Sequence, residues 1–152
     1  MYQIPGLFNL VRGKHTLHSK DKDRYDQGSH FGAWWRLGSA SRYAVSTHVQ
    51  RLLGLTFPYG ILSVNVIGSF LIGLCWSLAE AFQFSPNTRA FLFTGFFGGF
   101  TTFSSFSLDT MTLLRDGSYK IALMNILVSN VLALIAVFLG LILGKNLTSL
   151  LR

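Results

Sequence analysis

Two phenylalanines with hydroxyl side chains between them form the stretch of this sequence best suited to chemistry. Phe103 and Phe106 are three residues apart, so a helix through them places both rings on one face. The edge of an aromatic ring is electropositive and can contact a small anion favourably. Ser104 and Ser105 lie between the rings and supply hydroxyl donors. The stretch therefore predicts a lining for a small anion, with ordinary aromatic packing as the alternative.

A break in the helix is expected immediately before these rings. Small and hydroxyl residues follow one another closely there: Gly95, Gly98, Gly99, Thr101 and Thr102. Glycine weakens a helix interior, and interrupted helices often line binding sites in transport proteins. Unpaired backbone groups in hydrocarbon are costly, so a break persists only where protein, water or an ion satisfies them. The break is therefore a functional candidate.

Two further polar side chains lie within largely apolar stretches. Asn65 offers two amide donors inside a run without charge. It is a candidate donor to an anion, with an interhelical hydrogen bond as the alternative. Arg42 lies in a stretch rich in glycine, alanine and serine. We expect Arg42 to be buried at an interface or vestibule, where it either holds the first helix against a neighbour or attracts anions.

The elements that position these residues are predicted to be membrane-spanning helices. The 152-residue chain is 50% hydrophobic and 12% charged. No Asp, Glu, Lys or Arg occurs in residues 52–79, 90–108 or 121–144, and each run approximates the ~20 apolar residues that cross a bilayer. A soluble chain of this length has too little other protein to cover three such helices. The sequence therefore predicts an all-α membrane protein.

Turn and helix-breaking residues divide the chain into an N-terminal arm and a membrane domain. Residues 1–30 are predicted to form a flexible polar arm. No secretory signal peptide is predicted in this arm. Residues 31–152 form the membrane domain, with turns at 85–87 and 116–117. Its four transmembrane helices are predicted at about 31–53, 58–82, 88–114 and 119–144. The third is expected to be broken near the bilayer centre.

The charged and reactive residues argue against two other classes of protein. The formal charge of +7 is spread over the arm, the loops and the C-terminal tip, which is typical of membrane-flanking anchors rather than of a nucleic-acid surface. His15 and His18 lie in the arm, and no Ser, His and Asp constellation is visible, so no enzyme is predicted. Cys75 is the only cysteine and forms no intrachain disulfide.

Two segments of the sequence resemble a known family. Residues 60–73 (GILSVNVIGSFLIG) and 95–109 (GFFGGFTTFSSFSLD) closely resemble the Fluc/CrcB fluoride channels, and the similarity extends over roughly residues 31–147. The resemblance implies an antiparallel, dual-topology dimer in the lipid bilayer, with two fluoride pores around a central sodium ion. It also implies passive fluoride export by a multi-pass protein of the cell inner (plasma) membrane, which reduces fluoride toxicity.

The resemblance also assigns pore residues. It implies that Phe103 and Phe106 are the pore phenylalanines. Ser104, Ser105 and Ser129 are then expected to form a polar track beside the rings. For Ser129 the alternative is a hydrogen bond to its own helix backbone four residues earlier.

The same resemblance places the sodium ligands and marks two departures from the family pattern. It implies that the backbone carbonyls of Gly98 and Thr101 in each subunit bind structural Na⁺, a hard cation that accepts oxygen ligands readily. Many family members carry tyrosine where this chain has Asn125 and glutamate where it has Asp109. Asp109 is therefore expected either to contact the pore entrance or to be an ordinary interfacial carboxylate.

The orientation of the subunit depends on the N-terminal arm. Three basic residues are expected on each side of the membrane: Arg89, Lys145 and Arg152 on one, Arg51, Arg115 and Lys120 on the other. The arm adds more basic residues on one side, and a Lys and Arg excess decides orientation. A homodimer and a heterodimer with an oppositely oriented homologue both remain open.

Two other functions are compatible with four membrane helices. A small multidrug exporter needs an intramembrane carboxylate to couple protons, whereas Glu80 lies at the end of a predicted helix. A non-transporting membrane interaction or assembly subunit explains the glycine and serine faces but not the composition of residues 98–109.

Overall fold

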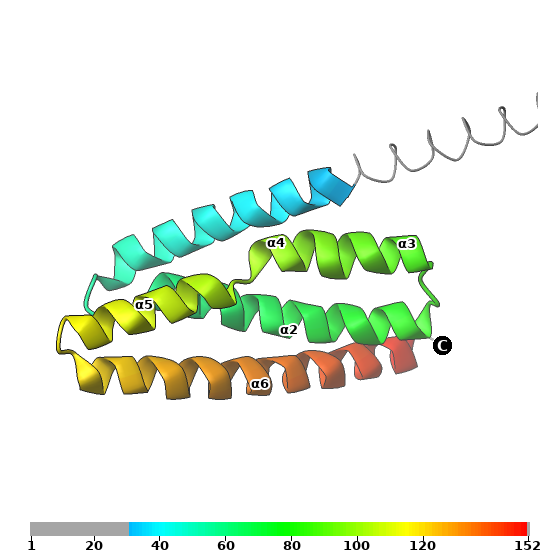
Figure 1. Ribbon diagram of the computed structural model, residues 1–152. Helices are drawn as coiled ribbons and strands as arrows, with labels where there is room; N and C mark the ends of the chain where they lie inside the picture. The colour runs from blue at the N-terminus through cyan, green and yellow to red at the C-terminus, as the bar shows by residue number, and fades with distance from the viewer. Residues whose placement is uncertain (1–30, 152) are drawn as a thin grey trace, which may run out of the picture.

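The computed structural model describes residues 31–151, and all the regular elements in that range are helices (Figure 1). The all-helical class predicted from the sequence is thus confirmed. The chain is helical over residues 31–53, here called the first helix. It is followed by α2 (Tyr59–Ala81), α3 (Pro86–Arg89), the π-helix η1 (Ala90–Phe97), α4 (Gly98–Phe100), α5 (Phe103–Arg115) and α6 (Tyr119–Leu150). The arm predicted for residues 1–30 lies outside the described residues.

Helices α2 and α6 lie side by side in the bundle (Figure 1). A Cβ atom added to Gly73 of α2 would meet the backbone at Val137, and one added to Gly140 of α6 would meet the backbone at Phe70. The two backbones therefore touch, as small residues permit between membrane helices.

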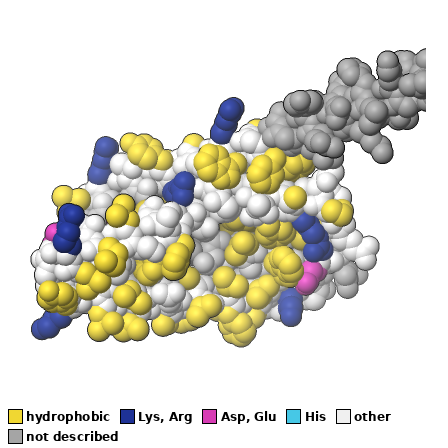
Figure 2. Space-filling model, viewed as in Figure 1, with side chains coloured by type: hydrophobic (Ala, Val, Ile, Leu, Met, Phe, Trp, Pro, Cys, Tyr) yellow, Lys and Arg dark blue, Asp and Glu magenta, His cyan; other side chains and the backbone are white. Residues whose placement is uncertain are grey.

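The outer surfaces of α2 and α6 are apolar. Their most hydrophobic 18-residue windows have mean hydropathies of 1.9 and 2.8, and only 22% and 17% of those residues are buried within the chain. Figure 2 shows apolar side chains over the middle of one face, with basic side chains toward the ends and along the first helix. Both helices are thus long and apolar enough to cross a bilayer.

The third predicted helix is built in two parts. Helices α3, η1 and α4 continue one another, and the chain then becomes extended at Thr101 (ψ 157°) and Thr102 (φ −152°, ψ 119°) before α5 begins. The predicted break therefore occurs at the two threonines, after the glycines rather than among them. Gly99 is helical and serves a close contact, because a Cβ on it would meet the backbone of the first helix at Trp35 and Ser39.

Two predicted helix ends differ from the structure. The fourth helix was expected to end at Gly144, but α6 continues to Leu150 because Gly144 packs closely against Leu74 and Ser77 of α2. The third was expected to begin at Thr88, but α3 begins at Pro86. Ser85 caps that helix by accepting a hydrogen bond from the Thr88 amide, and proline is favoured at the first helical position.

The side chain of Gln50 joins the first helix to the start of α2. Its Nε2 donates to the carbonyl oxygen of Phe57 over 2.9 Å, and its Oε1 accepts from the amide of Gly60 over 2.8 Å. A Cβ on Gly60 would meet the backbone of Ser46. The loop over residues 54–58 is therefore held between two closely packed helices.

Candidate functional site

The break in the third helix is held open by a side chain from α2. Asn65 Nδ2 donates to the carbonyl oxygen of Thr102 over 3.0 Å, and the amide of Thr102 donates to Asn65 Oδ1 over 2.8 Å. The side-chain amide of Asn65 thus makes the two bonds that a backbone neighbour would make. Thr102 is buried, so its polar backbone groups would otherwise be costly.

A second side chain begins the helix that follows the break. Thr102 Oγ1 accepts from the amide of Ser105 over 3.2 Å and so caps α5. This is the usual role of threonine at a helix N-terminus. At the break between the two parts of the helix, polar backbone groups are therefore hydrogen-bonded to side chains.

These two side chains change the environment of two backbone carbonyls. In a continuous helix the amide of Thr102 would donate to the carbonyl of Gly98, and that of Ser105 to the carbonyl of Thr101. Here both amides donate to side chains instead, to Asn65 and Thr102. The carbonyls of Gly98 and Thr101 therefore lose their regular helical donors.

Those two carbonyls have the chemistry of ligands for a hard cation. Gly98 is exposed, and a Cβ on it would meet only the carbonyl oxygen of Phe93, at 4.0 Å. No group of three or more His, Cys, Asp or Glu side chains within residues 31–151 is arranged to hold a metal ion. Backbone carbonyl oxygens are ligands of the kind that a hard cation accepts.

A groove of about 250 Å³ lies beside the break. Residues of α2, the break, α5 and α6 line it: Asn65, Ser69, Ile72, Thr101, Thr102, Phe103, Phe106, Ser129, Asn130 and Ala133. The structure therefore brings together four of the predicted site residues, namely Asn65, Phe103, Phe106 and Ser129, with the predicted sodium ligand Thr101.

The two phenylalanines form one aromatic wall of this groove. The ring centroids of Phe103 and Phe106 are 5.3 Å apart, and the ring planes are tilted by 45°. Phe106 is 8% exposed, whereas Phe103 is 74% exposed. Because Phe103 projects from the single chain, its ring is available to a second molecule as well as to the groove.

A buried chain of hydrogen bonds leads from the groove into the contact between α5 and α6. Ser129 Oγ bonds Asn125 Oδ1 over 3.2 Å, Asn125 Nδ2 bonds Thr110 Oγ1 over 2.9 Å, and Thr110 Oγ1 bonds the carbonyl oxygen of Phe106 over 2.8 Å. Asn125 is 1% exposed. Ser129 therefore bonds the Asn125 side chain, whereas the sequence had left its own helix backbone as the alternative partner.

Four other predicted site residues lie outside the groove, as does the predicted sodium ligand Gly98. Ser104 is exposed and Ser105 half-buried on α5, and both lie within hydrogen-bond distance of Thr102 Oγ1, at 3.2 and 3.1 Å. Arg42 is half-buried, and its side chain makes no hydrogen bond or ion pair with another residue of the described range. The fourth, Asp109, lines a different groove.

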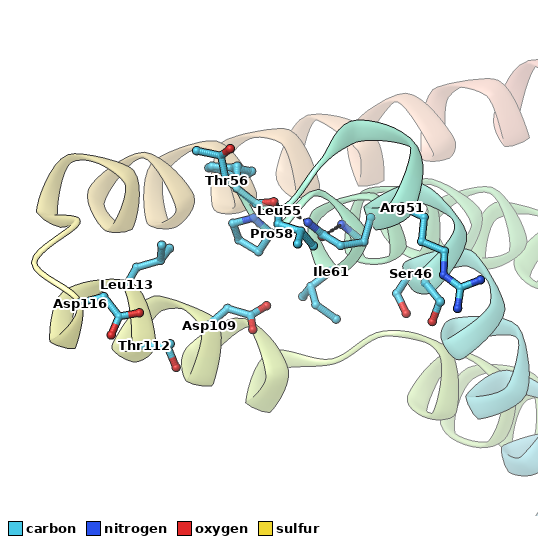
Figure 3. A pocket seen from close by; sticks show the side chains of 14 residues that line it. Ser46, Arg51, Leu55, Thr56, Pro58, Ile61, Asp109, Thr112, Leu113 and Asp116 are labelled. Atoms are coloured by element: carbon cyan, nitrogen blue, oxygen red, sulfur yellow. Dashed lines mark hydrogen bonds between the residues drawn. The ribbon is translucent and has the colours of Figure 1, made fainter.

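That second groove, of about 560 Å³, lies between the first helix, the start of α2 and α5. Figure 3 shows Asp109 and Thr112 of α5 across the groove from Ser46 and Arg51 of the first helix. The groove therefore carries both signs of charge. A position at the end of the bundle fits either of the two roles that the sequence leaves open for Asp109.

Three polar residues of the site region were not predicted as site residues from the sequence. Ser69 and Asn130 line the groove, and Thr110 belongs to the buried chain. Helical spacing could have found two of them, because Ser69 lies one turn after Asn65 and Thr110 one turn after Phe106. Asn130 is a polar residue within a charge-free run, which is itself a signal in a membrane helix.

Comparison with known proteins adds independent information on the whole bundle. Residues 30–141 match the family model described as CrcB-like protein, Camphor Resistance (CrcB). A protein of Parabacteroides distasonis named Fluoride-specific ion channel FluC is 69% identical over 116 residues, which cover 76% of this chain and 91% of that protein. A protein of Agrobacterium fabrum with the same name is 50% identical over 112 residues, covering 73% of this chain and 90% of that protein. The matched residues include both grooves and the break.

Proposed function

Because the chain belongs to the CrcB family, and is thus a membrane protein of an ion-channel family, we propose that it is a fluoride-selective channel. It gives passive fluoride export across the cell inner membrane, which it crosses as a multi-pass protein, and so reduces fluoride toxicity. One observation carries the proposal: the family match includes every residue that lines the groove at the break. The ion is the one for which these relatives are named fluoride-specific channels.

The lining of the groove supports selectivity for a small, tightly hydrated anion. Such an ion enters an apolar pathway only where donors replace its water. The ring edges of Phe103 and Phe106 are electropositive, and the neighbouring Asn65 carries amide donors. Rings and donors together exchange the hydration shell for protein contacts, while a larger halide fits the closely spaced rings less well.

The exposure of α5 supports a dimer. Phe103, Leu108 and Met111 are each more than half exposed in the single chain, so a second subunit has an apolar face to cover. An antiparallel partner would complete each pathway with its own aromatic rings. The partner is a second copy of this chain or an oppositely oriented homologue.

The carbonyls released at the break are the proposed sodium ligands. Gly98 and Thr101 of this subunit would hold a structural Na⁺ together with the same groups of its partner. Such a cation offsets the electrostatic repulsion between anions in two neighbouring pathways. Sodium is then expected to raise the melting temperature of the dimer in detergent compared with choline, and equal melting temperatures in the two salts would contradict this site.

Ion release from proteoliposomes tests the channel itself. The wild-type protein is expected to release trapped fluoride and retain chloride, and Phe103→Ile to slow fluoride release by about tenfold or more, since the aromatic contact with the anion is lost. Phe138→Ile is the matched control, because Phe138 is also exposed, on α6, but lies away from the groove. Equal release of both anions by the wild-type protein would refute selectivity, and no release of either would favour an assembly subunit.

A further inference from the structure

The hydrogen-bond chain behind the groove determines where the hydroxyl proton of Ser129 points. A backbone carbonyl only accepts, so Thr110 must donate to the Phe106 oxygen. Thr110 Oγ1 therefore accepts from Asn125 Nδ2, which turns Asn125 Oδ1 toward Ser129. Ser129 must then donate to Asn125. Only lone pairs of Ser129 are left to face the groove, and lone pairs repel an anion.

The threonine hydroxyls of the groove are also engaged. Thr101 Oγ1 donates to the carbonyl oxygen of Phe97 over 3.0 Å, and Thr102 Oγ1 donates to Ser105 Oγ over 3.1 Å. Each hydroxyl has one proton. Neither threonine can therefore donate to an ion in the groove without giving up a bond within the protein.

Two other groove residues retain hydrogens that are not engaged. Ser69 is half-buried on α2, and its hydroxyl bonds no residue of the range 31–151. Asn130 Nδ2 donates once, to the carbonyl oxygen of Ile126 over 2.6 Å, which leaves its second amide hydrogen. Asn65 likewise has one hydrogen beyond the bond to Thr102. These are the donors that the groove offers.

We propose that Ser69 and Asn130 supply the hydrogen bonds that hold an anion in this groove, and that Ser129 does not contact it. Asn125 is then a positioning residue, because it fixes the proton of Ser129 toward the interior. The inference rests on the proposed fluoride pathway. It replaces Ser129 by Ser69 as the serine that donates a hydrogen bond to the anion. Ser69 and Asn130 come from α2 and α6, so the anion is held between the two helices that contact most closely.

Fluoride release by two matched serine variants tests the proposal. Ser69→Ala is expected to slow fluoride release from proteoliposomes by about tenfold or more, the effect of losing a hydrogen bond to a charged group. Ser129→Ala is expected to change it by less than about twofold, since the lost bond is an ordinary one within the protein. The opposite order of the two effects would overturn the proposal.

Dimer content and melting temperature are measured for both variants. If Ser69→Ala dissociates the dimer, its hydroxyl binds the partner subunit rather than the anion, and the proposal is wrong. An intact dimer with slow release supports it.

A spectroscopic measurement separates this inference from the proposed function. The protein is labelled with ¹⁵N-asparagine, and the side-chain amides are assigned with Asn125→Leu and Asn130→Leu. Added fluoride is expected to shift the Asn130 signal and leave that of Asn125 unchanged. A shift of Asn125 would mean that Ser129 turns toward the ion, which refutes the assignment. A wild-type protein that shows the Asn130 shift but releases no fluoride would refute the channel and retain the binding site.

Discussion

Replacing Asn65 by leucine leaves the side-chain volume nearly unchanged but removes both hydrogen bonds that hold the break. If these were two ordinary interhelical bonds, the loss would be about 1 kcal/mol, since such bonds average ~0.6 kcal/mol in membranes. However, the partners are the buried amide and carbonyl of Thr102, and each orphaned group costs about 1–3 kcal/mol. We therefore expect Asn65→Leu to lower the free energy of unfolding by about 2–6 kcal/mol.

Denaturant titration in detergent micelles measures this change. Asn146→Leu is the control, because Asn146 is exposed near the end of α6. Asn65→Asp is informative as a second variant: it keeps the acceptor for the Thr102 amide but sets a carboxylate oxygen against the Thr102 carbonyl. A loss of about 1 kcal/mol or less for Asn65→Leu would mean that the break does not depend on Asn65 and would refute the reasoning.

Two further substitutions test the packing and the cap. Gly140→Ala is expected to destabilise the bundle by about 1–3 kcal/mol through overpacking, because the new methyl group meets the backbone at Phe70. Gly32→Ala is the control and should have little effect, since a Cβ there has nothing within 4 Å. Equal melting temperatures for the two variants would contradict the close contact. Thr102→Val removes the hydrogen bond that caps the Ser105 amide and should lower the free energy of unfolding by about 1 kcal/mol. Thr112→Val is the control, because Thr112 lies on the exposed face of α5. If the two variants unfold at the same denaturant concentration, the cap is not stabilising.

The sequence was sufficient to predict the class of fold and the break, but not what holds the break. Charge-free runs of bilayer length predict membrane helices because burying charge in hydrocarbon is costly. Glycine and threonine composition predicts an interruption. Its position at Thr101 and Thr102 depends on Asn65, which lies on another helix and 37 residues away from Thr102. A tertiary bond of this kind leaves no local pattern to detect.

The candidate site shows the same limit. The same-face placement of Phe103 and Phe106 followed from helical spacing, and their rings are neighbours. The direction of the Ser129 hydroxyl could not be predicted, because it depends on Thr110 and a backbone carbonyl across the α5–α6 contact. Gly144 was ambiguous for a related reason: a glycine near a helix end either stops the helix or admits a neighbour, and only the packing of α2 decides.

Because Asn65 bonds Thr102, the position of Asn65 along α2 sets the depth of the break in the membrane. The two half-helices meet where α2 presents an amide, so inserting a residue into α2 before Asn65 would rotate that amide by about 100° and leave the threonines facing an aliphatic side chain. Changes in length at Leu55 and Thr56 of the loop over residues 54–58 can be absorbed because both residues are exposed, whereas changes within the first turns of α2 cannot. Among natural variants of this chain, insertions should therefore collect in that loop and be absent from the following turns of α2.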